Sequence, residues 1–520
     1  MMRNPGDDGH PKVGGRGGIW LNKPNILFIM SDQLRADALG CAGNPHVQTP
    51  NLDRLAAEGI HFANAFTPCP LCVPARISVT TGCYPHKAAG SKQNNGRISP
   101  GFPLLGEELN RRGYETYAVG KLHYHPYQPP GTPRTTHGLT HVELAESGRI
   151  VHKYDPLNTT RGLEDYLDYL ETVGWGGYSR GNGLGNNDIF PAASVIPTEH
   201  YVDSWVADRA IHHLQTHVRE KADKPFFMWA SFPKPHSAYD PPHPFDCMYD
   251  PRTLPAPIGD ISLIRERGIG TLHQDYIRYG WHTLSPAAKQ VIKAHYYGLV
   301  SLQDQLVGRL LAFLDDNGLR DNTIVVFTSD HGDMLGDFGL FFKKMFYNGS
   351  VRIPLLFRYP GVTPTGVKSQ AMVGLQDLLP TLLSLGGQPL ERPIDGLDLS
   401  PVFAGKRAEV RTFFVSQCNN GAPDRRYMVT DRRWRYIYHE YGGIEELYDE
   451  QEDPQELRNL ASERTQETKS ITEDMRNWLL RWCIDNKDEN MLEGGKLARS
   501  DAPIAMEPTR RKEPFGRRYY

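Results

Sequence analysis

Short apolar runs that end in polar residues recur along the chain. Residues 26–30 are wholly apolar and lead to Asp32, and the mostly apolar residues 323–328 lead to Asp330. Continuous apolar runs of about four to eight residues are typical of buried parallel strands. Open α/β sheets bind their ligands beyond the carboxyl ends of such strands. The pattern therefore predicts a functional site where these two strands end.

Helical patterns alternate with strand patterns through the first three quarters of the chain. We also expect strands at 114–119 and 225–231, and helices at 51–59, 75–82, 104–112, 163–173 and 285–317. This alternation predicts the α/β class, with a large, mostly parallel sheet flanked by helices on both faces.

The pattern changes near residue 405. Short strands are predicted at 411–416, 427–430 and 433–438, and a helix at 463–482. Strands this close in sequence favour antiparallel pairing, so we predict a smaller C-terminal α+β subdomain with an antiparallel sheet. The predicted organisation is a disordered leader over 1–23, the main α/β domain over 24–405, the subdomain over 406–485 and a tail over 486–520.

Composition narrows the class of protein. Lys plus Arg is 58 and Asp plus Glu is 61, so a net charge of −3 leaves no basic excess for binding nucleic acid. No run reaches the ~20 apolar residues of a membrane helix, so no membrane association is expected. The first residues lack the apolar core of a signal peptide, and we expect a cytoplasmic protein. The basic, aromatic end of the tail is either disordered or an arm that packs on a second copy in a homo-oligomer.

Acidic residues stand at the ends of two predicted strands. If these strands are parallel neighbours, Asp32 and the pair Asp330-His331 converge at one edge of the sheet. Carboxylate oxygens and an imidazole suit a divalent cation such as Ca²⁺, Mg²⁺ or Mn²⁺. Each aspartate alone is equally typical of a helix N-cap after a strand. Their combination favours the metal site.

The cysteines do not form a disulfide framework, because there are only seven in 520 residues. Cys69 and Cys72 form a CxxC, which alone suggests a redox pair or half of a zinc site. No second CxxC completes a four-cysteine site. Cys72 also begins a different pattern, in which Pro74 and Arg76 follow at alternate positions.

A series of ordered motifs resembles those of the sulfatase family of the alkaline phosphatase superfamily. They are the opening at 25–33, the segment 49–56, Cys72-x-Pro74-x-Arg76 with Thr81-Gly82, Gly120-Lys121-x-His123, Pro235-His236, Asp330-His331-Gly332-Asp333 followed by Lys343, and a C-terminal segment at 446–461. Together they span about residues 24–465. Cys69 does not fit, because Leu71 stands where the motif needs Pro.

The resemblance implies chemistry at Cys72. A formylglycine-generating maturation enzyme would oxidise Cys72 to an aldehyde, whose hydrate attacks the sulfur of a sulfate ester and later eliminates sulfate. By resemblance the other catalytic residues are Arg76, which orients the nucleophile, Lys121 and Lys343, which bind sulfate oxygens, His123 as base and His236 as acid. Lys344 is the alternative to Lys343.

The resemblance also implies one divalent metal ion, with Ca²⁺ as the family default and Mn²⁺, Mg²⁺ or Zn²⁺ as alternatives. Its ligands would be Asp32, Gln33, Cys72, Asp330 and His331. Many relatives carry Asp in place of Gln33 and Asn in place of His331, so the sequence leaves the identity of the metal open.

The predicted function is hydrolysis of a sulfate monoester on a carbohydrate or another small organic molecule. A phosphonate or phosphate ester hydrolase of the same superfamily is the alternative, and Lys121 with His123 favours sulfate. A non-catalytic binding protein on the same scaffold is a third hypothesis. Trp175, Tyr178 and Arg180 are candidate contacts for a sugar or an aryl ring, or they pack their loop onto the core.

Overall fold

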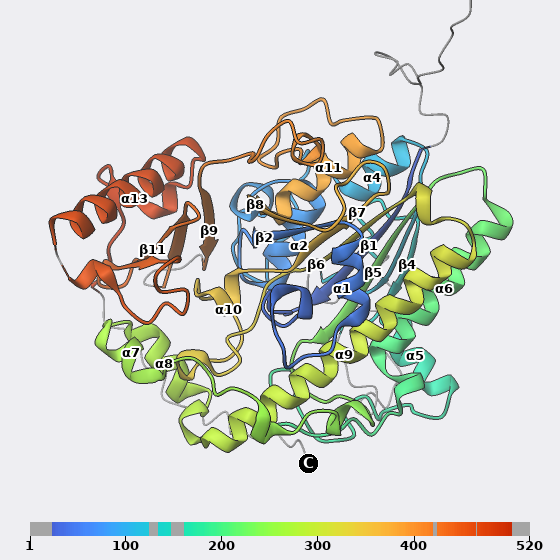
Figure 1. Cartoon of the computed structure of the whole chain (residues 1–520), viewed down its shortest axis with the longest axis horizontal. Coiled ribbons are helices and arrows are strands. Elements are labelled where there is room, and N and C mark those ends of the chain that lie inside the picture. Colours follow the sequence, from blue (N-terminus) through green and yellow to red (C-terminus); the bar gives the residue numbers. More distant parts are fainter. Residues whose placement is uncertain (1–22, 124–133, 147–160, 420–423, 464, 502–520) are drawn as a thin grey trace, which may run out of the picture.

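Eight strands form the main sheet of the computed structural model, which describes residues 23–123, 134–146, 161–419, 424–463 and 465–501 (Figure 1). In spatial order they are β4 (His141–Leu144), β3 (Glu115–Gly120), β5 (Phe226–Pro235), β1 (Asn25–Asp32), β6 (Thr323–Ser329), β7 (Leu355–Arg358), β2 (Ile60–Phe66) and β8 (Val367–Gly374). Of these eight strands, only β7 runs antiparallel to its neighbours. The predicted mostly parallel sheet is therefore confirmed.

Helices cover both faces of this sheet (Figure 1). Along β1, Leu27 and Ile29 face one apolar cluster while Ile26 and Phe28 face the other, because successive strand side chains point to opposite faces. The first cluster includes α1 (Pro50–Ala57), α5 (Asp165–Thr172), α6 (Val202–Glu220) and α9 (Pro286–Asp316). The second includes α2 (Cys72–Thr81), α4 (Leu105–Arg111), α11 (Leu378–Leu385) and α12 (Ser400–Phe403).

A second sheet of four antiparallel strands lies at the left of Figure 1. Its order is β12 (Ile444–Asp449), β11 (Trp434–His439), β10 (Arg426–Thr430) and β9 (Phe414–Cys418). Helix α13 (Gln466–Asp485) packs Leu479 and Trp482 into one cluster with Tyr427 and Tyr436 of this sheet. The predicted C-terminal α+β unit is confirmed.

Shorter elements complete the chain. They are α3 (Pro85–Ala89), α7 (Ile261–Glu266), α8 (Gly270–Arg278), α10 (Asn348–Val351) and the hairpin of β13 (Leu492–Glu493) with β14 (Lys496–Leu497). None of the helices in the described ranges combines the length and apolar composition that crossing a membrane requires.

The two ends of the predicted organisation have different outcomes. Residues 1–22 of the predicted leader and 502–520 of the predicted tail lie outside the described residues. Residues 486–501 of the predicted tail are described, and they continue from α13 into the β13–β14 hairpin. Met491 is fully buried in the cluster of the second sheet, and Leu492 and Leu497 pack against the same cluster.

The carboxyl ends of four strands lie side by side, because β3, β5, β1 and β6 are parallel neighbours. Strands β1 and β6 stay in register up to the pair Ser31 and Ser329. Asp32 and Asp330 therefore leave the sheet together, as the sequence predicted.

Candidate active site

Cys72 is the first residue of α2, whose first turn lies against the strand ends. Leu71 is extended before the helix, and Gly82 ends it at φ 68°, a conformation that favours glycine. Cys72 Sγ lies 3.2 Å from His331 Nε2 and 3.8 Å from Asp32 Oδ1. The local fold thus brings the predicted nucleophile to the two acidic strand ends.

Four buried side chains gather their ligand atoms within 4.8 Å of one another: Asp32, Cys72, Asp330 and His331. His331 Nδ1 lies 2.9 Å from the Gly332 carbonyl oxygen, so Nδ1 carries the hydrogen of this contact. Nε2 is then the nitrogen that can bind a metal ion. Two carboxylates and an imidazole nitrogen are a donor set that fits a divalent cation. These four residues are the ones that would hold it.

Arg76 joins the two aspartates from the next turn of α2. Its Nε donates to Asp330 Oδ2 at 3.0 Å, and its Nη2 lies 3.3 Å from Asp32 Oδ2. Its Nη1 donates to Ser231 Oγ at 2.9 Å and to the Lys121 carbonyl oxygen. The planar guanidinium is fully buried, so it fixes the relative position of the two carboxylates.

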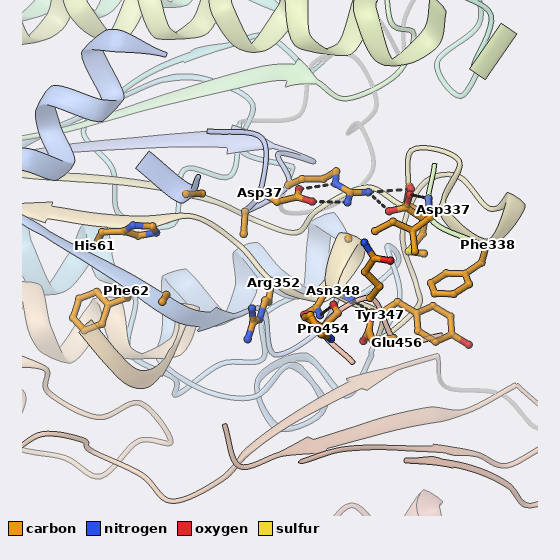
Figure 2. A pocket seen from close by; sticks show the side chains of 18 of the residues that line it. Asp37, His61, Phe62, Asp337, Phe338, Tyr347, Asn348, Arg352, Pro454 and Glu456 are labelled. Atoms are coloured by element: carbon orange, nitrogen blue, oxygen red, sulfur yellow. Dashed lines mark hydrogen bonds and ion pairs between the residues drawn. The ribbon is translucent and has the colours of Figure 1, made fainter. Parts of the chain in front are cut away.

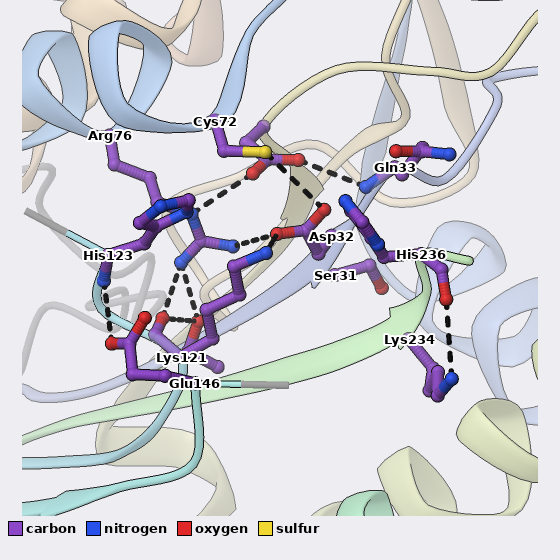
Figure 3. A network of polar contacts seen from close by, with 12 residues as sticks. Ser31, Asp32, Gln33, Cys72, Arg76, Lys121, His123, Glu146, Lys234 and His236 are labelled. Atoms are coloured by element: carbon purple, nitrogen blue, oxygen red, sulfur yellow. Dashed lines mark hydrogen bonds and ion pairs between the residues drawn. The ribbon is translucent and has the colours of Figure 1, made fainter. Parts of the chain in front are cut away.

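Lys121 and Lys343 add positive charge around Asp32, and Figure 3 shows Lys121 beside its carboxylate. Lys121 Nζ lies 2.5 Å from Asp32 Oδ2, and Lys343 Nζ donates to Gln33 Oε1 at 2.6 Å. Burial raises the pKa of Asp32, but Lys121 and its cationic neighbours outweigh burial and hold it well below its usual value. Burial and Asp32 likewise raise the pKa of the Cys72 thiol, and Lys343, Lys121 and His331 bring it down to about 7. The site therefore stabilises negative charge at Cys72.

Gln33 has protein partners at both ends of its amide. Its Oε1 accepts from Lys343, and its Nε2 donates to Asp333 Oδ2 at 2.5 Å. Asp333 is itself held by the Tyr239 hydroxyl at 2.5 Å. The structure thus gives Gln33 a role in positioning Lys343, and its role as a metal ligand stays a prediction.

Both predicted catalytic histidines lie around this cluster (Figure 3). His123 and His236 are both buried, on the loops that follow β3 and β5. His236 Nδ1 lies 2.7 Å from the Ser237 carbonyl oxygen. Burial, Lys343 and Lys121 lower the pKa of His236 well below its usual value, so its resting form is neutral.

Two buried charged residues that hold these histidine loops were missed from the sequence. Glu146 Oε1 accepts from two consecutive backbone N–H groups, the second being that of His123 at 2.8 Å. Lys234 Nζ pairs with Asp240 Oδ1 at 2.5 Å and lies 3.4 Å from the His236 carbonyl oxygen. Lys234 stands two residues before a motif histidine, which was a usable signal, whereas Glu146 lies outside every motif.

The candidate substrate residues lie on one loop but have different surroundings. Trp175 and Tyr178 contact each other with ring centroids 5.8 Å apart. Arg180 lines a cavity of about 50 Å³ together with Lys234 and Ser237. This cavity puts Arg180 next to the segment that carries His236.

A larger cavity of about 230 Å³ lies elsewhere (Figure 2). Its wall includes Arg35, Asp337, Arg352 and Phe338, and none of the residues predicted for the active site. Arg35 donates to the Asp333 carbonyl oxygen at 3.0 Å and pairs with Asp337 at 2.6 Å. The cavity thus borders the loop after β6 from outside the Cys72 cluster.

Family models and curated proteins match most of the chain. The family model for sulfatases matches residues 24–388, and that for the C-terminal region of N-sulphoglucosamine sulphohydrolase matches residues 336–483. An arylsulfatase from Clostridium perfringens is 30% identical over 91% of this chain and 97% of its own. A choline-sulfatase from Rhizobium meliloti is 30% identical over 84% and 82%, respectively.

Solved structures share the fold. The phosphonate monoester hydrolase of Agrobacterium radiobacter superposes with a TM-score of 0.74 and 24% identity, covering 89% of this chain and 96% of its own. A protein in complex with its substrate D-glucosamine-2-N,6-O-disulfate superposes with a TM-score of 0.68 and 22% identity, covering 90% and 99%.

The fold and the site define a hydrolase of the alkaline phosphatase superfamily. Within it, the chain belongs to the sulfatase family, whose members hydrolyse sulfuric esters. Membership implies a divalent metal ion and a formylglycine residue in the active site.

Proposed function

We propose that this protein hydrolyses a sulfate monoester of a carbohydrate or another small organic molecule at the site around Cys72. The observation that carries the proposal is the convergence of Asp32, Cys72, Asp330 and His331 within 4.8 Å at the ends of parallel strands. Each of these residues belongs to a sequence motif that resembles the sulfatase pattern.

The charges of the site suit an anionic ester. Arg76, Lys121 and Lys343 supply three positive charges against the two carboxylates of Asp32 and Asp330. A sulfate monoester carries one negative charge, so the excess positive charge attracts it. Lys121 and Lys343 bind the sulfate oxygens and offset the charge that builds up on them in the transition state.

Two histidines move protons in this proposal. His123 accepts a proton when sulfate leaves residue 72, and His236 protonates the oxygen of the departing alcohol. His236 is neutral at rest because burial, and then Lys343 and Lys121, lower its pKa. A bound sulfate ester offsets these two lysine charges, which raises the pKa of His236 and lets it take up the proton that it later donates.

A formylglycine-generating enzyme converts Cys72 to the aldehyde in this proposal. We propose Ca²⁺ as the resident ion, because two buried carboxylates supply hard oxygen ligands. When bound, the ion supplies Lewis-acid stabilisation of negative charge. Manganese and zinc are the alternatives, because the His331 nitrogen also suits those ions. Elemental analysis of the purified protein tests the choice: stoichiometric calcium supports it, and manganese or zinc in its place overturns it.

The competing reaction is hydrolysis of a phosphonate or phosphate ester, since the phosphonate monoester hydrolase shares the fold. The test compares kcat/KM for para-nitrophenyl sulfate and the matched phenylphosphonate monoester on protein matured at Cys72. The proposal expects the sulfate to be preferred, and a preference for the phosphonate would replace it. A panel of sulfated sugars and choline sulfate then defines the alcohol.

Variants at two cysteines provide the matched control. Cys72→Ala abolishes turnover and leaves the folded protein intact, since it removes a single sulfur atom. Cys72→Ser is nearly inactive unless the maturation enzyme accepts serine. Cys69→Ser retains full activity, and its inactivation would revive the redox-pair hypothesis.

A further inference from the structure

A second group of metal-ligating side chains lies outside the active site. His243, Asp246 and Cys247 place one ligand atom each within 4.8 Å of one another. His243 Nδ1 lies 3.1 Å from Asp246 Oδ1 and 3.8 Å from Cys247 Sγ. In the described part of the chain, this group and the Cys72 cluster are the two that bring three or more such side chains together.

These separations match a tetrahedral zinc ion. Zinc lies about 2.0–2.1 Å from histidine nitrogen, about 2.0–2.2 Å from carboxylate oxygen and about 2.3 Å from thiolate sulfur. Tetrahedral angles then put nitrogen and oxygen about 3.4 Å apart, and nitrogen and sulfur about 3.6 Å apart. The two observed distances differ from these by a few tenths of an ångström, within reach of side-chain rotation alone.

The backbone of this segment is held in place, while its ligand atoms remain accessible. The Thr198 hydroxyl donates to the His243 carbonyl oxygen at 2.6 Å. The Phe245 carbonyl lies so close to Gly298 of α9 that a Cβ there would come within 2.2 Å of its oxygen. The His243 side chain is 78% exposed and that of Asp246 is 22% exposed. A metal ion can therefore reach three donors on a fixed backbone.

We infer that His243, Asp246 and Cys247 form a zinc site with its fourth position open to water. The thiolate and imidazole select a borderline-soft ion and disfavour Ca²⁺ and Mg²⁺, which take oxygen ligands. On binding, the Cys247 thiol releases its proton to solvent and its sulfur binds the ion, with no change of oxidation state. None of its residues belongs to the Cys72 cluster.

Alkylation of Cys247 with iodoacetamide, followed by peptide mass spectrometry on the full chain, tests the inference. A zinc-bound thiolate is a weaker nucleophile, so zinc slows alkylation of Cys247 by about tenfold or more. Magnesium has no effect. His243→Ala and Asp246→Asn remove the protection, whereas His46→Ala, which changes another exposed histidine, retains it. An alkylation rate unchanged by zinc, or full protection in His243→Ala, overturns the inference.

Cobalt gives a second readout that does not depend on reactivity. Co²⁺ bound to a thiolate shows a sulfur-to-metal charge-transfer absorption in the near ultraviolet. The difference spectrum between the unmodified chain and Cys247→Ser isolates this site, because Cys72 is the same in both proteins. A band in this difference spectrum supports the site, and its absence contradicts it.

Discussion

At the scale of single residues, the site depends on which cations reach the acidic strand ends. Lys343 donates to Gln33 Oε1, and its charge lowers the pKa of both Cys72 and His236. The side chain of the neighbouring Lys344 is exposed to solvent. The sequence favoured Lys343 and kept Lys344 as the alternative, and the geometry supports Lys343.

A matched pair of variants tests this separation. Lys343→Met lowers kcat by about 10²-fold, because it removes a cation that stabilises charge on the sulfate oxygens. Lys344→Met keeps a kcat close to that of the unmodified enzyme. Steady-state kinetics on an aryl sulfate measures kcat for both variants. A large loss of kcat in Lys344→Met with none in Lys343→Met would contradict the assignment of Lys343.

The sequence predicted the site residues that belong to motifs, but not the residues that hold the catalytic histidines in place. Asp32, Cys72, Asp330 and His331 were predicted to converge, and the structure brings them together. Glu146 was missed, because its partner His123 lies on another loop and only folding brings the two together. A carboxylate that accepts backbone N–H groups leaves no periodic pattern in the sequence.

At the scale of elements, the loop after β5 carries His236 and is held by a buried ion pair. Lys234 Nζ donates to the Ala238 carbonyl oxygen at 2.7 Å and pairs with Asp240, and both side chains are nearly buried. The Tyr201 hydroxyl also donates to Asp240, at 3.1 Å. Lys234 is thus a positioning residue for His236.

Breaking this pair should affect both stability and rate. Lys234→Met and Asp240→Asn each destabilise the protein by about 3 kcal/mol, because each leaves a buried charge uncompensated. The double variant loses less than the sum of the two single losses. Urea unfolding of the single and double variants measures the coupling free energy. In each single variant kcat falls and its pH profile is displaced, because the side chain of His236 changes position. Strict additivity of the two losses would show that the pair does not act as a unit.

Strands and helices with strong patterns were predicted well, and weaker patterns were missed. The run at 26–30 and the long helix at 285–317 match β1 and α9. Helix α6 was missed although Trp205, Val206 and Ala210 follow helical spacing, because many polar residues interrupt the pattern. Its apolar face gains stability by packing on β5, α9 and β3, contacts that the sequence does not reveal.

At the scale of the whole molecule, the segment after α13 contacts the main domain through a buried ion pair. Lys92 Nζ lies 2.8 Å from Asp488 Oδ1, and both side chains are almost fully buried. The Tyr427 hydroxyl of the second sheet also donates to Asp488. One carboxylate thus links three parts of the chain, in a segment that composition alone assigns to a tail.

This carboxylate makes stability depend on pH. Burial raises the pKa of Asp488, but Lys92, His86 and Tyr427 lower it below its usual value. Its contribution is therefore fully present above the unfolded pKa of about 3.9 and is lost as pH falls through the lower folded pKa. Asp488→Asn lowers the melting temperature at neutral pH and by less at pH 3, whereas the exposed Asp485→Asn changes neither. An equal loss at both pH values would show that the charge of Asp488 does not matter.

The most direct test of the account is peptide mass spectrometry across residues 60–86 of protein co-expressed with a formylglycine-generating enzyme. The account predicts that Cys72 appears as the aldehyde, with its sulfur replaced by oxygen, while Cys69 and Cys83 in the same region remain thiols. If Cys72 stays a thiol after this treatment, the proposed mechanism at this site is contradicted.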